Sequence, residues 1–278
     1  MDMSASVVNT RAVIALLTDF GLSDGYVGVM KGVIAGIAPD AQVIDITHAV
    51  APQQIASGAW QLATVYRYFP RGTVFTCVVD PGVGSTRGAI ALQAGDWFFV
   101  GPDNGLFSYI YAEQAIHQAV MLANTRYRLS QVSTTFHGRD VFAPAAAYLA
   151  QGVALSEFGP ASDPASLVRL DVRQPVRENG MIAARIVHID HYGNLVTNIP
   201  LTLVPDLFDE QVQVRAIFAE TGAVVEQRVR FFAAAPDAAP FLFTDSTETV
   251  GVAVREGNAA AALGVYLGSR VTLLIAPR

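Results

Sequence analysis

The feature that most constrains the fold is a regular alternation of short apolar runs and helical segments in the first 150 residues. The runs "AVIALL" (12–17), "AQVIDI" (41–46) and "TVFTCVV" (73–79) have the length and composition of buried strands. Between them lie two segments, 26–38 and 53–69, in which apolar residues recur at helical spacing. Strands that alternate with helices in this way form crossover units and lie parallel in one sheet. We therefore expect an α/β domain with a mainly parallel sheet.

The same region contains two further strand-like runs, at 89–93 and 97–100, and a helical segment at 141–150. Asp140 is expected to cap the start of this helix, and Gly152 is expected to stop it. These elements extend the expected α/β domain over residues 1–172.

Beyond residue 172 the pattern changes to short alternating or β-branched runs separated by turn residues. The runs "MIAARIVHID" (181–190), "QVQVRAIFA" (211–219) and "SRVTLLIA" (269–276) show little helical periodicity. Such runs indicate a small all-β domain, which we expect at 181–278. The polar segment between the two domains, residues 173–180, contains a proline and ends on a glycine, and it is interpreted as a linker.

Charge and cysteine content exclude several classes of function. The formal net charge is −6 and no Lys or Arg cluster is present, so nucleic acid is not expected as a partner. The one cysteine, Cys77, lies in an apolar run, which rules out an internal disulfide and favours a reducing compartment. The N-terminus does not resemble a signal peptide, and no run approaches the ~18 apolar residues of a membrane span. We expect a cytoplasmic protein.

Charged residues follow the predicted strands where a parallel sheet binds its ligands. Asp19 and Asp24 come after the first strand, and Asp80 comes directly after the third, followed by Arg87 in "VDPGVGSTR". Each pair also has a structural interpretation. Asp19 and Asp24 could cap the next helix, and Asp80 with Arg87 could be an ion pair that holds a loop.

Three other segments carry residues of interest. His137 stands in "TTFHGRD" just before the predicted helix, and "PDNG" (102–105) is first of all a turn. His188, Asp190 and His191 could suggest a metal site, but within a strand residues 188 and 190 share a face and residue 191 points the other way. We therefore expect no metal.

Together, the motifs "TDFG", "DGYVG", "VDPGVGSTR", "GPDNG", "TTFHGRD", "IDHYGN", "TNIP" and "AVREGNAA" resemble the S-adenosyl-L-methionine (SAM) hydrolases that form adenosine, also called SAM hydroxide adenosyltransferases. These are related to the fluorinase and chlorinase, which attack the same carbon of SAM with halide. The resemblance runs from about residue 12 to the C-terminus. It implies a C-terminal β-barrel, a homotrimer, and a SAM site between the N-terminal domain of one subunit and the C-terminal domain of its neighbour, without cofactor or metal.

The resemblance also implies the chemistry. Asp80, Arg87 and His137 would hold a water molecule, and the halide-using relatives lack this triad. Water is therefore the expected nucleophile, and the expected reaction is hydrolysis of SAM to adenosine and L-methionine by substitution at C5′ of the ribose. A SAM-dependent halogenase and a non-catalytic module that binds SAM or adenosine remain as alternatives.

By the same resemblance, further residues would contact the substrate. Where relatives commonly have a small residue or glycine, this chain has Glu248, in "DSTET". Asp19 would contact the ribose hydroxyls, Asp24 and Asp190 the methionine ammonium, and Tyr192 and Asn194 the adenosine. Ser246 would contact the amino-acid end of SAM, Arg255 and Glu256 the adenine, and Phe136 the substrate pocket in general.

Overall fold

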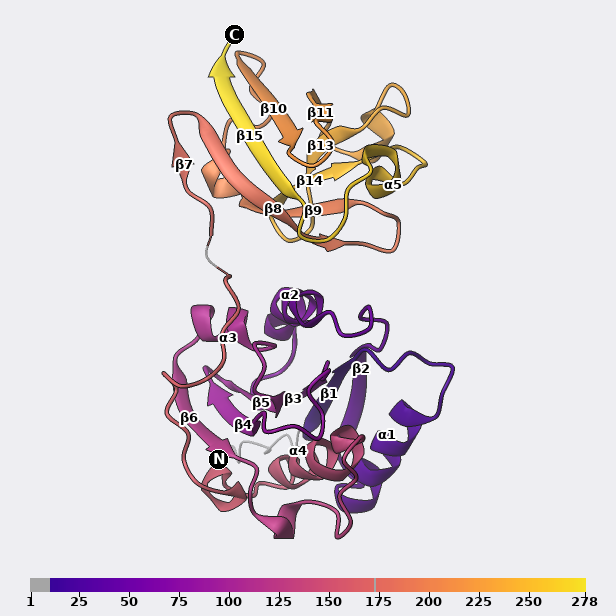
Figure 1. The fold of residues 1–278 in the computed structure, drawn as a ribbon, viewed down its shortest axis with the longest axis vertical. Helices are drawn as coiled ribbons and strands as arrows, with labels where there is room; N and C mark the ends of the chain where they lie inside the picture. Colours follow the sequence, from indigo (N-terminus) through magenta and orange to yellow (C-terminus); the bar gives the residue numbers. More distant parts are fainter. Residues whose placement is uncertain (1–10, 173) are drawn as a thin grey trace, which may run out of the picture. The chain divides into compact units, whose positions relative to one another are not determined.

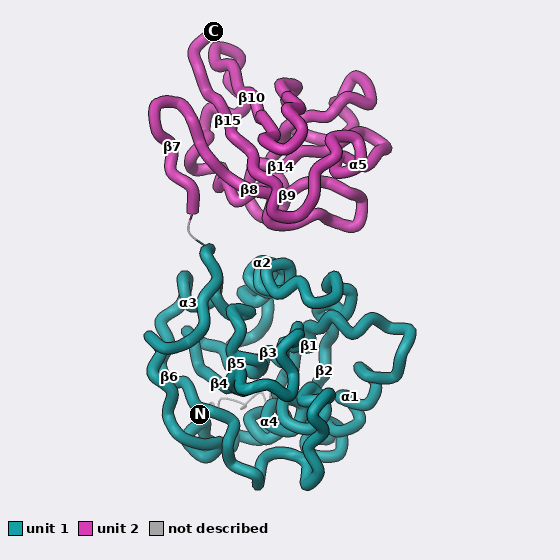
Figure 2. The backbone as a smooth tube through the Cα atoms, in the orientation of Figure 1, with its two compact units in different colours: residues 1–172 teal, residues 173–278 magenta. Residues whose placement is uncertain are grey.

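The computed structural model describes residues 11–172 and 174–278, and the chain divides into two compact units, residues 1–172 and 173–278 (Figures 1 and 2). Residues 1–10, where the first predicted domain begins, and residue 173, the first of the predicted linker, lie outside the described residues. The remainder of the predicted linker contains a short strand, β7 (Arg177–Glu178), which pairs with the sheet of the second unit. None of the helices in the described ranges is long and apolar enough to cross a bilayer.

The first unit is built on a six-stranded sheet with the order β2-β1-β3-β5-β4-β6 (Figure 1). The pairs β2 with β1, β1 with β3, and β3 with β5 are parallel, and only β4 runs against its neighbours. The prediction of an α/β domain with a mainly parallel sheet is confirmed. The strands are β1 (Val13–Thr18), β2 (Gln42–Thr47), β3 (Val74–Val78), β4 (Ala89–Ala94), β5 (Trp97–Pro102) and β6 (Ile116–Met121).

Helices cover both faces of this sheet, and strand β1 shows how. Its residues alternate between two apolar clusters, since Ile14 and Leu16 lie in one and Ala15 and Leu17 in the other. The first cluster contains buried residues of α1 (Tyr26–Ile37) and α4 (Ala143–Ala150). The second contains buried residues of α2 (Ile55–Val65) and α3 (Ser108–Glu113). A strand buried on both faces explains its continuous apolar sequence.

Two helix starts differ from the sequence prediction. Helix α2 begins at Ile55 because Gln53 has a left-handed backbone, with φ 66. The prediction that Asp140 caps the helix at 141–150 is wrong, because a π-helical turn, Gly138–Phe142, runs directly into α4. Asp140 lies inside that turn, fully buried, where its Oδ2 accepts the amide of Ser133 at 2.8 Å. The position of Asp140 at the start of α4 is therefore set by burial of its carboxylate and not by helix capping.

The second unit is a nine-stranded, barrel-like sheet. The strand order is β11-β10-β15-β8-β9-β14-β13-β12, with β7 paired to β8. The first and last strands of this order are separated in the chain by Glu226 alone, so the sheet curls until its two ends nearly meet. This confirms the all-β prediction. The remaining elements are β8 (Met181–Ile189), β9 (Leu195–Pro200), β10 (Val212–Phe218), β11 (Val224–Val225), β12 (Gln227–Arg228), β13 (Phe241–Thr244), β14 (Thr249–Ala253), α5 (Ala259–Leu263) and β15 (Arg270–Pro277).

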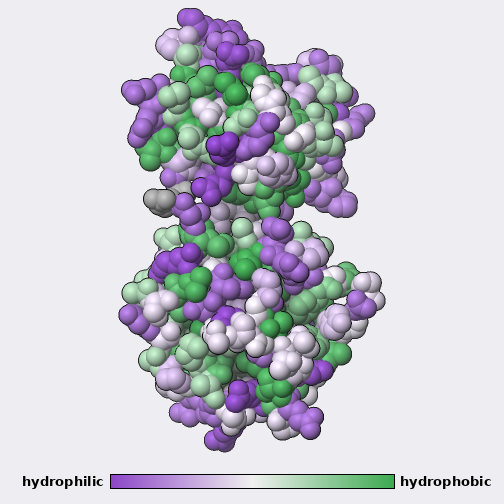
Figure 3. Space-filling model, in the orientation of Figure 1, coloured by the Kyte–Doolittle hydropathy of each residue, from purple (hydrophilic) through white to green (hydrophobic). Residues whose placement is uncertain are grey.

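Figure 3 shows hydrophilic and hydrophobic residues intermingled on the viewed face of each unit. Several large apolar side chains are nevertheless well exposed, among them Leu22, Tyr26 and Val29, in and just before α1. These residues follow closely on Asp19, at the carboxyl end of β1.

Candidate active site

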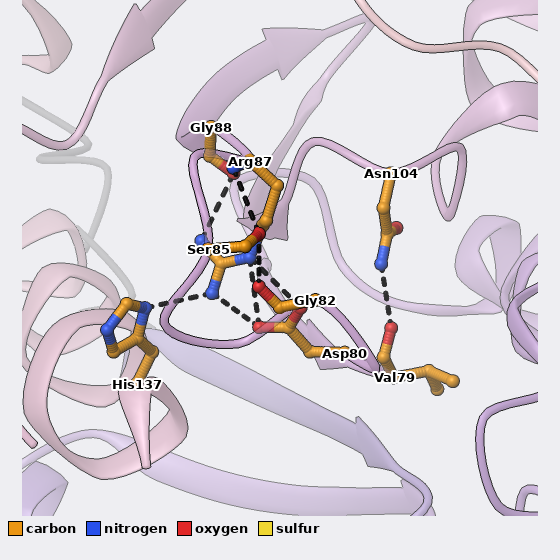
Figure 4. A network of polar contacts seen from close by, with 8 residues as sticks. All are labelled: Val79, Asp80, Gly82, Ser85, Arg87, Gly88, Asn104 and His137. Carbon is orange, nitrogen blue, oxygen red and sulfur yellow. Dashed lines mark hydrogen bonds and ion pairs between the residues drawn. The ribbon is translucent and has the colours of Figure 1, made fainter. Parts of the chain in front are cut away.

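Asp80, Arg87 and His137 converge at the carboxyl end of β3 (Figure 4). Asp80 follows this strand, Arg87 lies just before β4, and His137 occupies the N-cap of the π-helical turn. The Arg87 Nε atom donates to Asp80 Oδ1 at 3.0 Å and to Oδ2 at 3.1 Å, and Nη2 also donates to Oδ2. The same Nη2 lies 2.9 Å from His137 Nδ1. One guanidinium therefore joins the other two side chains.

This arrangement fixes the tautomer of His137. A guanidinium has only donors, so Nδ1 of the neutral ring must accept and the ring proton must lie on Nε2. Burial lowers the pKa of His137, and the positive charge of Arg87 lowers it further, while Asp80 and Asp140 oppose the shift. The imidazole is therefore neutral at pH 7 and presents an N–H donor on the side away from Arg87.

The Arg87 side chain is restrained by burial and by several contacts. Its side chain is 10% exposed and that of Asp80 is 4% exposed. The guanidinium also donates from Nη1 to the carbonyl of Gly88 at 3.2 Å and lies 5.3 Å from the centre of the Phe142 ring. A purely structural ion pair would need neither the histidine contact nor such restraint. The geometry favours a functional group over a simple loop clamp.

Glycine at position 84 allows the loop that carries Asp80 and Arg87 to approach the segment before His137. Gly84 has φ 78, and a Cβ on this residue would meet the carbonyl oxygen of Thr134 at 2.3 Å. The second glycine of "VDPGVGSTR" thus permits close packing between two loops.

Asn104 supports the same loop, although the sequence indicated only a turn at this position. The turn is present, with Gly105 at φ 98. In addition, Asn104 Nδ2 donates to the carbonyl of Val79 at 2.9 Å (Figure 4). Asn104 Oδ1 accepts the amide of Leu106 at 3.2 Å. Val79 precedes Asp80, so Asn104 fixes the backbone from which the carboxylate projects. The adjacency of β3 and β5 in the sheet was the signal that could have revealed this contact.

Asp19 and Asp24 do not cap the following helix. Helix α1 has Gly25 at its N-cap, and no side chain caps it. Asp19 Oδ2 instead accepts the amide of Gln53 at 2.8 Å, and the Asp24 side chain is exposed. The capping interpretation is therefore wrong for both residues.

Phe136 connects the Asp19 loop with the His137 loop. Its ring centre lies 5.8 Å from that of Phe20 and 5.2 Å from that of Tyr26, both edge-on. Phe20 follows Asp19 in the chain, and Phe136 precedes His137. The structure thus brings Asp19, Phe136 and the triad to one edge of the sheet.

In the second unit, Asp190 shapes the turn between β8 and β9. Its Oδ1 accepts the amides of Tyr192 at 2.9 Å and Asn194 at 2.8 Å, and its Oδ2 accepts Asn194 Nδ2 at 2.8 Å. Asn194 is buried, whereas Tyr192 is 73% exposed. Burial lowers the pKa of His188, with Asp190 and Asp245 opposing. No three His, Cys, Asp or Glu side chains of the described residues gather as a metal site.

The remaining predicted residues of this unit lie in two loops around β14. Ser246 belongs to a tight turn in which Asp245 Oδ1 accepts the amides of Thr247 at 2.9 Å and Thr249 at 3.0 Å. Glu248, in this turn, has φ 59, a conformation that costs a side-chain-bearing residue about 1–2 kcal/mol and glycine almost nothing.

Arg255 and Glu256 follow β14. Arg255 Nη1 donates to the carbonyl of Ala235 at 3.0 Å, and Glu256 is exposed, with φ 54. The predicted residues therefore form two groups, one in each unit: Asp19, Asp24, Asp80, Arg87, Phe136 and His137 in the first, and Asp190, Tyr192, Asn194, Ser246, Arg255 and Glu256 in the second.

Comparison with known proteins places the chain in a known enzyme family. Residues 14–159 match the SAM hydroxide adenosyltransferase N-terminal domain, and residues 184–272 match the SAM hydroxide adenosyltransferase C-terminal domain. The chain belongs to the SAM hydroxide adenosyltransferase family.

Relatives from several organisms agree with this. The chain is 42% identical over 259 residues to a (R)-S-adenosyl-L-methionine hydrolase of Salinispora tropica, which covers 93% of this chain and 96% of the relative. A protein of the same name from Thermus thermophilus is 37% identical over 268 residues, covering 93% and 98%. A fluorinase of an Actinoplanes species is more distant, 29% identical over 219 residues, covering 70% and 74%. A crystal structure of an uncharacterized conserved protein from Thermotoga maritima superposes with a TM-score of 0.87 at 35% identity, covering 94% of this chain and 99% of the other.

Proposed function

We propose that the protein hydrolyses SAM to adenosine and L-methionine, with water attacking C5′ of the ribose in line with the departing sulfur. The observation that carries this proposal is the contact of Arg87 with both Asp80 and His137 in a chain whose hydrolase relatives match it over nearly their full length. The new bond joins the water oxygen to C5′, the C5′–S bond breaks, its electron pair passes to sulfur, and one water proton is released.

The difficulty of the reaction lies in the nucleophile. The sulfonium of SAM leaves as a neutral thioether, so no acid is needed for the leaving group. Taking water from a pKa of 15.7 to hydroxide at pH 7 costs roughly 12 kcal/mol, at 1.36 kcal/mol per pKa unit. The protein must therefore stabilise negative charge on the water oxygen as the bond to carbon forms.

The geometry of the triad suits this task. His137 is neutral and its Nδ1 accepts from Arg87, so this nitrogen holds the guanidinium in place and does not accept the water proton. Arg87 provides positive charge beside the water. Asp80 Oδ1 accepts a bond from Arg87 Nε and, among the described residues, from no other group, so a lone pair remains for the water proton. Asp80 is thus the proposed proton acceptor, Arg87 supplies positive charge beside the water, and His137 is proposed to hold the Arg87 guanidinium in position.

The substrate contacts and the assembly are part of the same proposal. Asp19 would hold the ribose hydroxyls, and Asp24 and Asp190 would attract the methionine ammonium. A homotrimer that pairs the first unit of one subunit with the second unit of its neighbour would unite the two groups of residues. The exposed Leu22 and Tyr26 near Asp19 support a subunit contact there. A cytoplasmic location rests on the single cysteine.

The test is incubation with SAM followed by chromatography. We expect equal amounts of adenosine and methionine, and a large loss of both for Asp80→Ala and His137→Ala. Asp96→Ala is the matched control, because Asp96 lies in the turn after β4 and its carboxylate pairs only with the exposed Arg71 among the described residues, at 3.3 Å. Formation of 5′-chloro-5′-deoxyadenosine in the presence of chloride would identify a halogenase. Stoichiometric retention of SAM without product would identify a binding module.

A further inference from the structure

A buried polar network lies behind Asp19, outside the triad. Thr18, the last residue of β1, is fully buried, and His48, just after β2, is 4% exposed. The Oγ1 atom of Thr18 lies 2.9 Å from His48 Nδ1. Thr18 directly precedes Asp19, so this contact fixes the point at which the chain leaves the sheet.

The backbone around Asp19 is tied to His48 on both sides. Thr18 Oγ1 accepts the amide of Phe20 at 3.2 Å, which turns the chain at Asp19. The amide of Gly21 donates to the carbonyl of His48 at 2.8 Å. The hydroxyl of Thr18 can accept the amide of Phe20 and at the same time donate its own proton to His48 Nδ1. The side chain and the backbone of His48 thus both stabilise the turn that presents the Asp19 carboxylate.

A third contact acts on the carboxylate itself. The loop after His48 returns to Asp19, and the amide of Gln53 donates to Asp19 Oδ2 at 2.8 Å. Gln53 has φ 66, a strained conformation that persists only where surrounding contacts hold it. These contacts leave Asp19 Oδ1 free of bonds from the described residues and fix the direction in which it points.

The outer side of His48 faces a charged pair. His48 Nε2 lies 3.0 Å from Asp45 Oδ1. Asp45 Oδ2 accepts from Lys31 Nζ at 2.6 Å. Burial raises the pKa of Asp45, but Lys31 and His48 outweigh it and hold the pKa below its usual value. An ionised Asp45 favours the ring proton on Nε2, which leaves Nδ1 as the acceptor for Thr18.

We propose that His48 is a positioning residue for the nucleoside: through Thr18 it fixes the Asp19 carboxylate in the orientation that binds the ribose hydroxyls. The proposal rests on the proposed function. A threonine and a histidine that served stability alone could be replaced by apolar residues of similar shape at little cost. The convergence of three bonds on the turn around Asp19 indicates a role in binding.

Thr18→Val tests this directly, because it removes the hydroxyl and keeps the shape. We expect the KM for SAM, and the Kd for adenosine measured by calorimetry, to rise about five- to tenfold. The kcat should stay within about twofold, since the triad is untouched. Thr76→Val on the neighbouring strand is the matched control: Thr76 is fully buried, pairs with Leu16, and its Oγ1 has no hydrogen-bond partner among the described residues. It should change neither constant.

His48 variants and an Asp19 background separate positioning from folding. His48→Leu should weaken adenosine binding as Thr18→Val does, and His48→Asn, whose amide can replace Nδ1, should restore it. In an Asp19→Asn background, Thr18→Val should have no further effect, because both changes act through one carboxylate. Additive effects, or unchanged adenosine binding by Thr18→Val, would overturn the proposal. Adenosine binding is measured without turnover, so a protein that binds adenosine but does not cleave SAM would refute the proposed function and still decide the role of His48. A wild-type protein that binds no adenosine would refute both.

Discussion

Replacing Arg87 by lysine separates the charge of this residue from its geometry. The guanidinium reaches both oxygens of Asp80 and also His137 Nδ1. A lysine ammonium keeps the positive charge but presents its three donors at one point. It cannot span Asp80 and His137 together, so we expect the loss of at least two hydrogen bonds to charged or buried partners.

The size of the effect follows from these contacts. Hydrogen bonds to charged groups contribute about 1.5–3 kcal/mol each, so losing two removes about 3–6 kcal/mol. The retained charge recovers part of this, which leaves about 3–4 kcal/mol and a fall in kcat of roughly 100- to 1000-fold. The KM for SAM should change little, because the interactions lost are with Asp80 and His137 and not with the substrate.

The assay is the initial rate of adenosine release at saturating SAM. Arg67→Lys is the matched control: its Nη2 lies 2.7 Å from Glu113 Oε2, but the side chain is 54% exposed, so the substitution should leave kcat within about twofold. If Arg87→Lys keeps more than about a third of the wild-type kcat while Asp80→Ala abolishes turnover, the planar fork of Arg87 has no part in catalysis and the roles proposed for the triad must be revised.

Three further predictions concern the same unit. Burial, aided by the charge of Arg87, lowers the pKa of His137, and the active ring is the neutral one. The kcat/KM should therefore stay level from pH 8 to below 6.5 and fall only at lower pH, and a decline centred at or above 6.5 would contradict the lowered pKa. Gly84→Ala introduces a clash with Thr134 and should lower both the melting temperature and kcat. Gly72→Ala is the control: Gly72 has a similar φ of 82 but open space around it, so the substitution should lower stability by only about 1–2 kcal/mol and leave kcat unchanged. Burial raises the pKa of Cys77, so a thiol reagent should label it only after denaturation, and rapid labelling of the native enzyme would show that the strand opens.

Much of the first unit was predictable because its strands are buried on both faces. The run at β1 is apolar up to Thr18, the run at β3 is interrupted only by Thr76, and helical spacing marks α1 clearly. Strand β6 was missed, since His117 and Gln118 interrupt its apolar pattern and it lies at the sheet edge. The start of α4 was wrong because the capping rule considers only local backbone groups. The Asp140 carboxylate instead accepts hydrogen bonds from the amide of Ser133 and from the Arg139 side chain.

The sequence located the charged residues of the site but not their interactions. The positions of Asp80 and Arg87 follow from the rule that parallel sheets bind ligands at the carboxyl ends of strands. The tautomer of His137 depends on a contact between residues 50 positions apart, and the support by Asn104 depends on which strands are neighbours. Neither can be inferred from spacing along one chain. The involvement of Asp190 in its own turn is similar, since its carboxylate bonds depend on the path of the backbone.

The hydrogen-bonding character of the triad gives a physical reason for water as the nucleophile. A water molecule can donate a hydrogen bond to the free lone pair of Asp80 Oδ1. A halide ion can only accept, so it would face the buried carboxylate without a donor between them. At 4 Å and an effective dielectric constant of 20, two like unit charges repel by about 4 kcal/mol. Arg87 offsets part of this repulsion but is already bonded to the same carboxylate. High chloride should therefore neither inhibit SAM hydrolysis nor divert it, and Asp80→Asn, which removes the repelling charge, is the variant in which chloride competition should first be detectable by product analysis.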